Sequence, residues 1–266
     1  MHLENRILEK RSLALLVSLG VISGGMFFVP PIAQDPLYHL FADTRRCLGL
    51  ANFGDVISNG GFLLVGFIGL LQLRRLRNQG RFESFQQILP FLVFFVAVAF
   101  VAPGSAYYHE APDNDRLFWD RLPMTVAFMS LFAGILADRV HPVFAGKALW
   151  IMVLLGIASL VYWQQTELRG IGDLRPYALV QFYPMVALPL ICWFYPKARH
   201  TPVKYLIWMY VWYAAAKLLE FLDTEIFLAL GSGISGHSLK HIVAAIAVYM
   251  VVRMLGDSEK AELNRS

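Results

Sequence analysis

The sequence predicts an all-α integral membrane protein, a seven-transmembrane-helix bundle with one additional N-terminal transmembrane helix. Hydrophobic residues make up 57% of the 266-residue chain, charged residues make up 16%, and the mean hydropathy is +0.53. This apolar share exceeds that of an ordinary soluble domain. Apolar runs of about twenty residues, the length that crosses roughly 30 Å of hydrocarbon, recur along the whole chain. Residues 1–266 are therefore predicted to form a single membrane domain.

Eight apolar segments are long enough to be membrane-spanning helices. Backbone polar groups in lipid must be satisfied within the segment, and these runs are too long, and alternate too little, for barrel strands. The first segment, 12–30, is the additional helix, although its cationic start and the small-residue stretch after it also fit a cleavable signal peptide. The seven helices of the core are predicted at 53–73, 85–109, 117–137, 142–163, 176–195, 202–221 and 237–252.

The distribution of Lys and Arg predicts the orientation. Fifteen of them lie in the N-terminal segment and in the connections on the same side, six lie on the opposite side, and Lys217 and Lys240 lie within helices. The positive-inside rule then places both termini in the cytoplasm. Because these cations are dispersed between apolar runs, nucleic acid is not an expected partner. Cys47 and Cys192 fall on opposite sides of the membrane and are predicted not to pair.

Polar residues gather at one depth of the predicted bundle. An ionisable side chain inside a membrane helix is costly, so each one is a candidate functional residue. Three distant segments carry such candidates toward the non-cytoplasmic side: the end of 85–109, the start of 117–137 and the start of 237–252. The residues are Ser105, His109, Asp120, His237 and His241.

The three histidines have the pattern of an open zinc site. His237 and His241 are four residues apart, so both imidazoles lie on one face of a helix. His109 comes from a second helix, and three neutral nitrogen ligands leave the fourth tetrahedral position for water, as in catalytic zinc sites. Each of these residues also has a simpler interpretation. A histidine can be a packing residue, Asp120 can be a favourable charge at a helix start, and Ser105 can be a small packing residue. Their common depth favours a site.

Two motifs resemble a known family. The run Gly-Ser-Ala-Tyr-Tyr-His at 104–109 is followed after ten residues by Asp-Arg-Leu-Pro-Met at 120–124, a spacing similar to that of the alkaline ceramidases. The segment 53–59 also looks like the first core helix of that family. These enzymes belong to a wider superfamily of seven-helix membrane hydrolases that includes the progestin and adiponectin receptors. The short loops look more like those of the bacterial members.

The resemblance implies an intramembrane zinc amidase that cleaves the N-acyl bond of ceramide or a related lipid amide. It implies His109, His237 and His241 as zinc ligands, with Ser105 and Asp120 as catalytic residues. The expected partners are the lipid substrate and the membrane, with no obligate protein partner, and a bacterial member would lie in the inner membrane. Eukaryotic ceramidases also bind Ca²⁺ near the first core helix, but Asn52 stands where they carry a glutamate, which counts against Ca²⁺ here.

Two other functions compete with hydrolysis. A ligand-binding receptor of the progestin or adiponectin type would keep the same metal site. A transporter would use the polar cluster to line a substrate path, although the chain shows no repeat between its halves. Lys217 and Glu220, three residues apart in 202–221, are predicted to pair for structural reasons.

Overall fold

The computed structural model describes the backbone of residues 2–263 and the side chains of residues 10–257. The described chain is helical and contains no strand, as the sequence predicts. Its longer helices follow the apolar runs of the sequence. They are α1 (His2–Met26), α3 (Gly60–Asn78), α4 (Phe85–Glu110), α5 (Asn114–Arg139), α6 (Lys147–Leu168), α7 (Arg175–Phe194), α8 (Val203–Phe221) and α10 (Gly236–Leu263). The shorter helices are η1 (Pro36–His39), α2 (Phe53–Ser58), η2 (Pro142–Ala145) and α9 (Asp223–Ala229).

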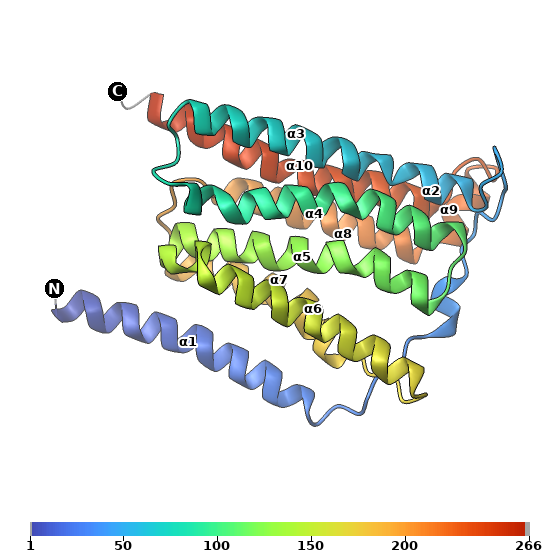
Figure 1. The fold of residues 1–266 in the computed structure, drawn as a ribbon, viewed down its shortest axis with the longest axis horizontal. Helices are drawn as coiled ribbons and strands as arrows, with labels where there is room; N and C mark the ends of the chain where they lie inside the picture. Colours follow the sequence, from blue (N-terminus) through green and yellow to red (C-terminus); the bar gives the residue numbers. More distant parts are fainter. Residues whose placement is uncertain (1, 264–266) are drawn as a thin grey trace.

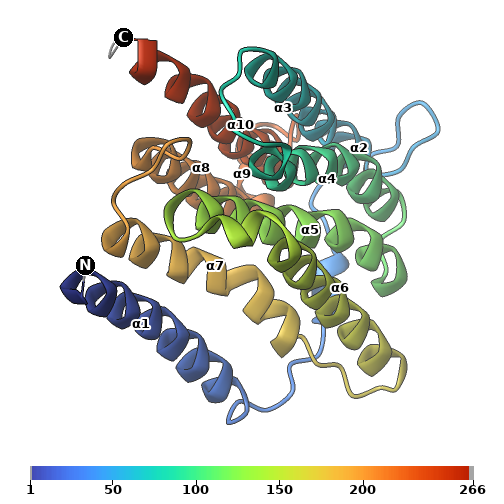
Figure 2. The ribbon, with the colours of Figure 1, turned by 60° about the vertical axis from the view of Figure 1, so that its left-hand side comes forward.

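The helices pack side by side with α5 in the interior of the bundle (Figure 1). Helix α5 contacts α4, α6 and α7, while α3 packs against α4 and α10, and α8 packs against α10. Helix α1 lies along the outside and packs against α7, which both views show (Figure 2). The additional N-terminal helix of the prediction is therefore peripheral to the core.

Six of the described helices are long and apolar enough to cross a membrane. They are the continuous segment Phe53–Asn78, together with α4, α5, α6, α7 and the Gly236–Asp257 part of α10. The chain is thus a candidate multi-pass membrane protein. The predicted spans in α1 and α8 do not meet the same criterion, so a count of seven plus one remains a prediction.

Both ends of the described chain lie at the same end of the bundle (Figure 1). The end of α4 and the starts of α5 and α10 lie at the opposite end, as the predicted alternation of the helices requires. The assignment of the first end to the cytoplasm rests on the cation count alone. Within that count, Arg265 and the side chains of Arg6 and Lys260 lie outside the described residues.

Three predicted helix starts are wrong. The segment 12–30 begins instead at His2, and the other two starts differ for a local reason. The segment 142–163 begins instead at Lys147, because Pro142 opens a single 3₁₀ turn that is capped by the His141 side chain. Helix α5 begins at Asn114 rather than at residue 117, since the side chain of Asp113 accepts a hydrogen bond from the Arg116 amide and caps the helix.

Glycine allows α4 and α5 to approach closely next to the polar cluster. A Cβ atom on Gly104 would lie 2.4 Å from the Trp119 carbonyl oxygen. That carbonyl has lost its helical partner, because Pro123 has no amide hydrogen to donate to it. The contact fixes the end of α4 against the second turn of α5, where Ser105 and Asp120 lie.

Candidate metal centre

Three buried histidines meet at the end of the bundle opposite the termini. One nitrogen each from His109, His237 and His241 lies within 4.8 Å of the others, so the three can hold one metal ion. The ring centroids are 4.8 Å apart for His109 and His237, and 4.9 Å apart for each other pair. The three residues are 1%, 5% and 3% exposed. The structure therefore brings together the triad that the sequence predicts.

His109 lies at the C-terminal end of α4, where a residue of the loop before α2 holds the backbone. The Asn52 side-chain amide donates a hydrogen bond of 2.7 Å to the His109 carbonyl oxygen. Asn52 itself is left-handed, with a φ of 46°, a conformation that asparagine tolerates better than most residues. The Nδ1 atom of His109 is buried and has no hydrogen-bond partner. In its unprotonated form this nitrogen has a free lone pair that a metal ion would satisfy.

Polar side chains from three elements orient the two histidines of α10. The Ser58 hydroxyl lies 2.8 Å from His241 Nδ1, which leaves Nε2 of that ring available as a ligand. The His237 amide donates to the Asp223 carboxylate at 2.7 Å, so Asp223 fixes the backbone at the start of α10. The Lys240 ammonium lies 3.1 Å from His237 Nε2 and 2.7 Å from the Glu220 carboxylate.

The chemistry of this donor set fits a transition metal. Three imidazoles with an open position suit zinc and its neighbours, whereas Mg²⁺ and Ca²⁺ prefer oxygen ligands. A metal-ligating histidine coordinates through one ring nitrogen and hydrogen-bonds through the other. The unpartnered Nδ1 of His109 fits the first role, and the hydrogen-bonded Nδ1 of His241 fits the second. The residues present therefore fit the group that the sequence implies.

Ser105 and Asp120 are buried beside the triad. They are 3% and 7% exposed, and both line the same cavity. Because α5 begins at Asn114, Asp120 lies nearly two turns inside the helix, so its simpler interpretation as a charge at a helix start is wrong. Asp113 has that capping role instead. A carboxylate buried in mid-helix requires another explanation.

A cavity joins these residues to one of the histidines. It has a volume of about 290 Å³ and is lined by Ser105, Asp120 and His241. A second cavity of about 170 Å³ lies deeper between the helices and is almost wholly apolar. The two share Phe62, Val101, Met124, Phe128, Gln181, Tyr213 and Ala244 as lining residues. A polar compartment beside the three histidines is thus adjacent to a hydrophobic one inside the bundle.

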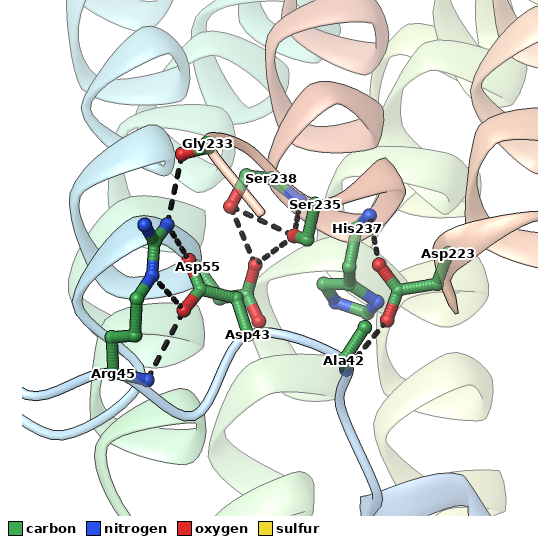
Figure 3. A network of polar contacts seen from close by, with 9 residues as sticks. All are labelled: Ala42, Asp43, Arg45, Asp55, Asp223, Gly233, Ser235, His237 and Ser238. Carbon is green, nitrogen blue, oxygen red and sulfur yellow. Dashed lines mark hydrogen bonds and ion pairs between the residues drawn. The ribbon is translucent and has the colours of Figure 1, made fainter. Parts of the chain in front are cut away.

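The buried carboxylate of Asp55, on α2, holds the start of α10 in place. Asp55 of α2 is 0% exposed and accepts hydrogen bonds from the Ser235 and Ser238 hydroxyls, at 2.9 and 2.6 Å, as Figure 3 shows. Nearby, the Arg45 guanidinium binds both oxygens of Asp43 and the Gly233 carbonyl oxygen. The side-chain hydrogen bonds from Arg45 lower the pKa of the Asp43 carboxyl.

Sequence reasoning missed the residues that surround the ligands. The ring of Phe41 covers the triad, with centroids 4.7 Å from His109 and 4.5 Å from His237. Lys217 and Glu220 do pair, but Glu220 also binds Lys240, so they are part of the site and not an isolated pair. His39, at the end of η1, bonds through its ring to the Tyr108 hydroxyl at 2.9 Å.

No protein-family model matches the sequence, and no curated protein matches it.

Proposed function

We propose that this chain is an intramembrane zinc-dependent amidase that hydrolyses the N-acyl bond of ceramide or a related lipid amide. The products are a free fatty acid and a sphingoid-type amine. The observation that carries the proposal is the adjacency of a cavity lined by His241, Ser105 and Asp120 to an apolar cavity inside the bundle, with lining residues in common. Such a space suits a substrate with a polar linkage and a long apolar chain.

When bound by the three histidines, zinc would supply an acidic water and polarise the carbonyl oxygen of the amide. Among the described residues that line the same cavity, Asp120 is the buried carboxylate, so it takes the proton of the attacking water. The water oxygen bonds to the carbonyl carbon, and the C–N bond then breaks. Asp120 returns the proton to the leaving amine nitrogen.

Ser105 lines the same cavity as this carboxylate. It lies one turn before His109 on α4. In that place the hydroxyl can donate a hydrogen bond to the oxygen that gains negative charge. The buried walls exclude bulk water, which strengthens this interaction.

The proposal is tested by fatty-acid release from detergent-solubilised protein supplied with ceramides, other N-acyl lipids and O-acyl lipids. We expect release that requires zinc, stoichiometric zinc that is lost in His237→Ala, and a loss of turnover in Asp120→Asn with zinc retained. Full activity after complete removal of zinc would contradict the proposal. Bound metal without turnover on any lipid would favour a ligand-binding receptor of the progestin or adiponectin type.

A further inference from the structure

The cavity beside the metal centre contains more cations than anions. Of the described residues that line it, Arg121, Lys217 and Lys240 are cationic, and Asp120 and Glu220 are anionic. The Glu220 carboxylate is shared, at 2.5 Å from the Lys217 ammonium and 2.7 Å from that of Lys240. Two ammonium groups therefore have one carboxylate between them.

Arg121 is the least compensated of the three cations. It is 6% exposed, and its Nη2 atom donates to the neutral side chain of Gln34 at 2.7 Å, but its buried Nη1 atom has no partner. Among the described residues it forms no ion pair. The guanidinium is held over the rings of Trp163 and Tyr177, at 4.5 and 4.9 Å from their centroids.

A buried arginine in this state destabilises the folded protein unless an anion or an acceptor binds it. The guanidinium stays charged in proteins, and a buried charge without a counter-ion is strongly disfavoured. The rings fix its orientation and provide cation–π attraction, but they do not satisfy the free N–H group. Tyr213 lines the same cavity, and its hydroxyl is also buried without a partner. Two unsatisfied donors thus border one space.

We propose that this cavity binds a carboxylate or phosphate carried by the lipid next to the bond that is cleaved. Arg121 is the principal ligand of the anion, Tyr213 adds a hydrogen bond, and Lys217 adds charge at the more exposed side. Arginine matches the planar, bidentate geometry of both anions. The inference rests on the proposed function for the bond that is cleaved, and within that class of lipid amides it adds a preference for those that carry an anion beside the amide.

A matched pair of lipids tests the anion site by binding alone. N-oleoylglycine and N-oleoylethanolamine have the same acyl chain and amide, but only the first carries a carboxylate. We expect zinc-loaded protein to bind N-oleoylglycine about tenfold more tightly, the value of one charge-assisted hydrogen bond. Arg121→Gln should remove that preference by weakening N-oleoylglycine only, and soluble glycine or inorganic phosphate should compete poorly because neither has a chain.

Two further variants keep the test decisive if Arg121→Gln unfolds. Arg121→Lys retains the charge and should retain part of the preference, while Lys217→Gln, at a more exposed position, should reduce it. Arg116→Gln is the matched control, because Arg116 lies on the same helix but pairs with Glu110 outside the cavity. It should leave both affinities unchanged.

The outcomes separate this inference from the amidase proposal. Equal affinity for the two lipids, or equal weakening of both by Arg121→Gln, would overturn the anion site and give Arg121 a purely structural role. A clear preference for N-oleoylglycine, with no fatty acid released from any N-acyl lipid, would support the anion site and contradict the amidase. Release of oleate from both lipids at the same kcat/KM would support the amidase and contradict the anion site.

Discussion

The hydroxyl of Ser58 lies 2.8 Å from Nδ1 of His241, and this contact joins the first core helix to the last. It selects which nitrogen of the ring is available to a metal, because the other is already engaged. Partners of this kind fix the tautomer and the orientation of ligating histidines. The site therefore depends on residues outside the triad, and they can be tested separately from it.

Replacing Ser58 by alanine should weaken zinc binding by about tenfold or more while the triad stays complete. The imidazole of His241 would then rotate freely about its side-chain bonds. Competition with a chromogenic chelator measures the change. Ser159→Ala is the control, since that buried serine bonds only to the Gly156 carbonyl of its own helix. Equal zinc affinity in Ser58→Ala and the wild type would show that the contact does not support the ligand.

Gly104→Ala should destabilise the protein by about 1–3 kcal/mol, the usual cost of overpacking, and should also reduce turnover. The added Cβ would meet the Trp119 carbonyl oxygen at 2.4 Å, so α4 and α5 must separate beside Ser105. Thermal melting in detergent and fatty-acid release measure the two effects. A Cβ on Gly60 meets nothing within 4 Å, so Gly60→Ala should be neutral or stabilising. Similar behaviour of the two variants would refute the steric argument.

Chelation of the metal should lower the melting temperature of the wild type but not of His109→Ala. A ligand that binds only the folded state stabilises it by about 2.7 kcal/mol when present at 100 times its Kd. Loss of His109 removes one of three ligands, so the variant has little bound metal to lose. His141→Ala should respond like the wild type, because His141 is exposed and lies in the loop before η2. An unchanged melting temperature of the wild type in excess chelator would argue against a structural contribution of the metal.

Acid should remove the contribution of Asp43 to stability. Hydrogen bonds from Arg45 lower the pKa of this carboxyl from its ordinary value of 3.8, so the folded state holds the proton more weakly than the unfolded state. The stabilisation is therefore complete above about pH 4 and disappears as the pH falls through the lowered pKa. The difference in melting temperature between the wild type and Asp43→Asn should shrink over that range. A difference that is constant from pH 7 to pH 3 would show that the charge is not involved.

The sequence was sufficient to predict most of the helices and the proximity of the three histidines, but not the surroundings of the histidines. Apolar length and the alternation of helix directions predicted that His109 and the pair at 237 and 241 would share one end of the bundle, and they do. The start of α5 was predicted at residue 117 instead of Asn114 because the cap at Asp113 lies outside the apolar run, where hydropathy carries no information. Ser58 and Phe41 were missed because their contacts with the triad depend on tertiary packing, which has no local pattern.

The metal centre also constrains the order in which the molecule can be completed. His109 ends α4, whereas His237 and His241 open α10, the last helix of the described chain. Chains emerge from the ribosome N-terminus first, so the earlier helices are made while two of the three ligands have not yet been synthesised. A metal ion held by all three histidines would then be captured late in biogenesis. Retained metal would accordingly report that the last helix has inserted and docked correctly.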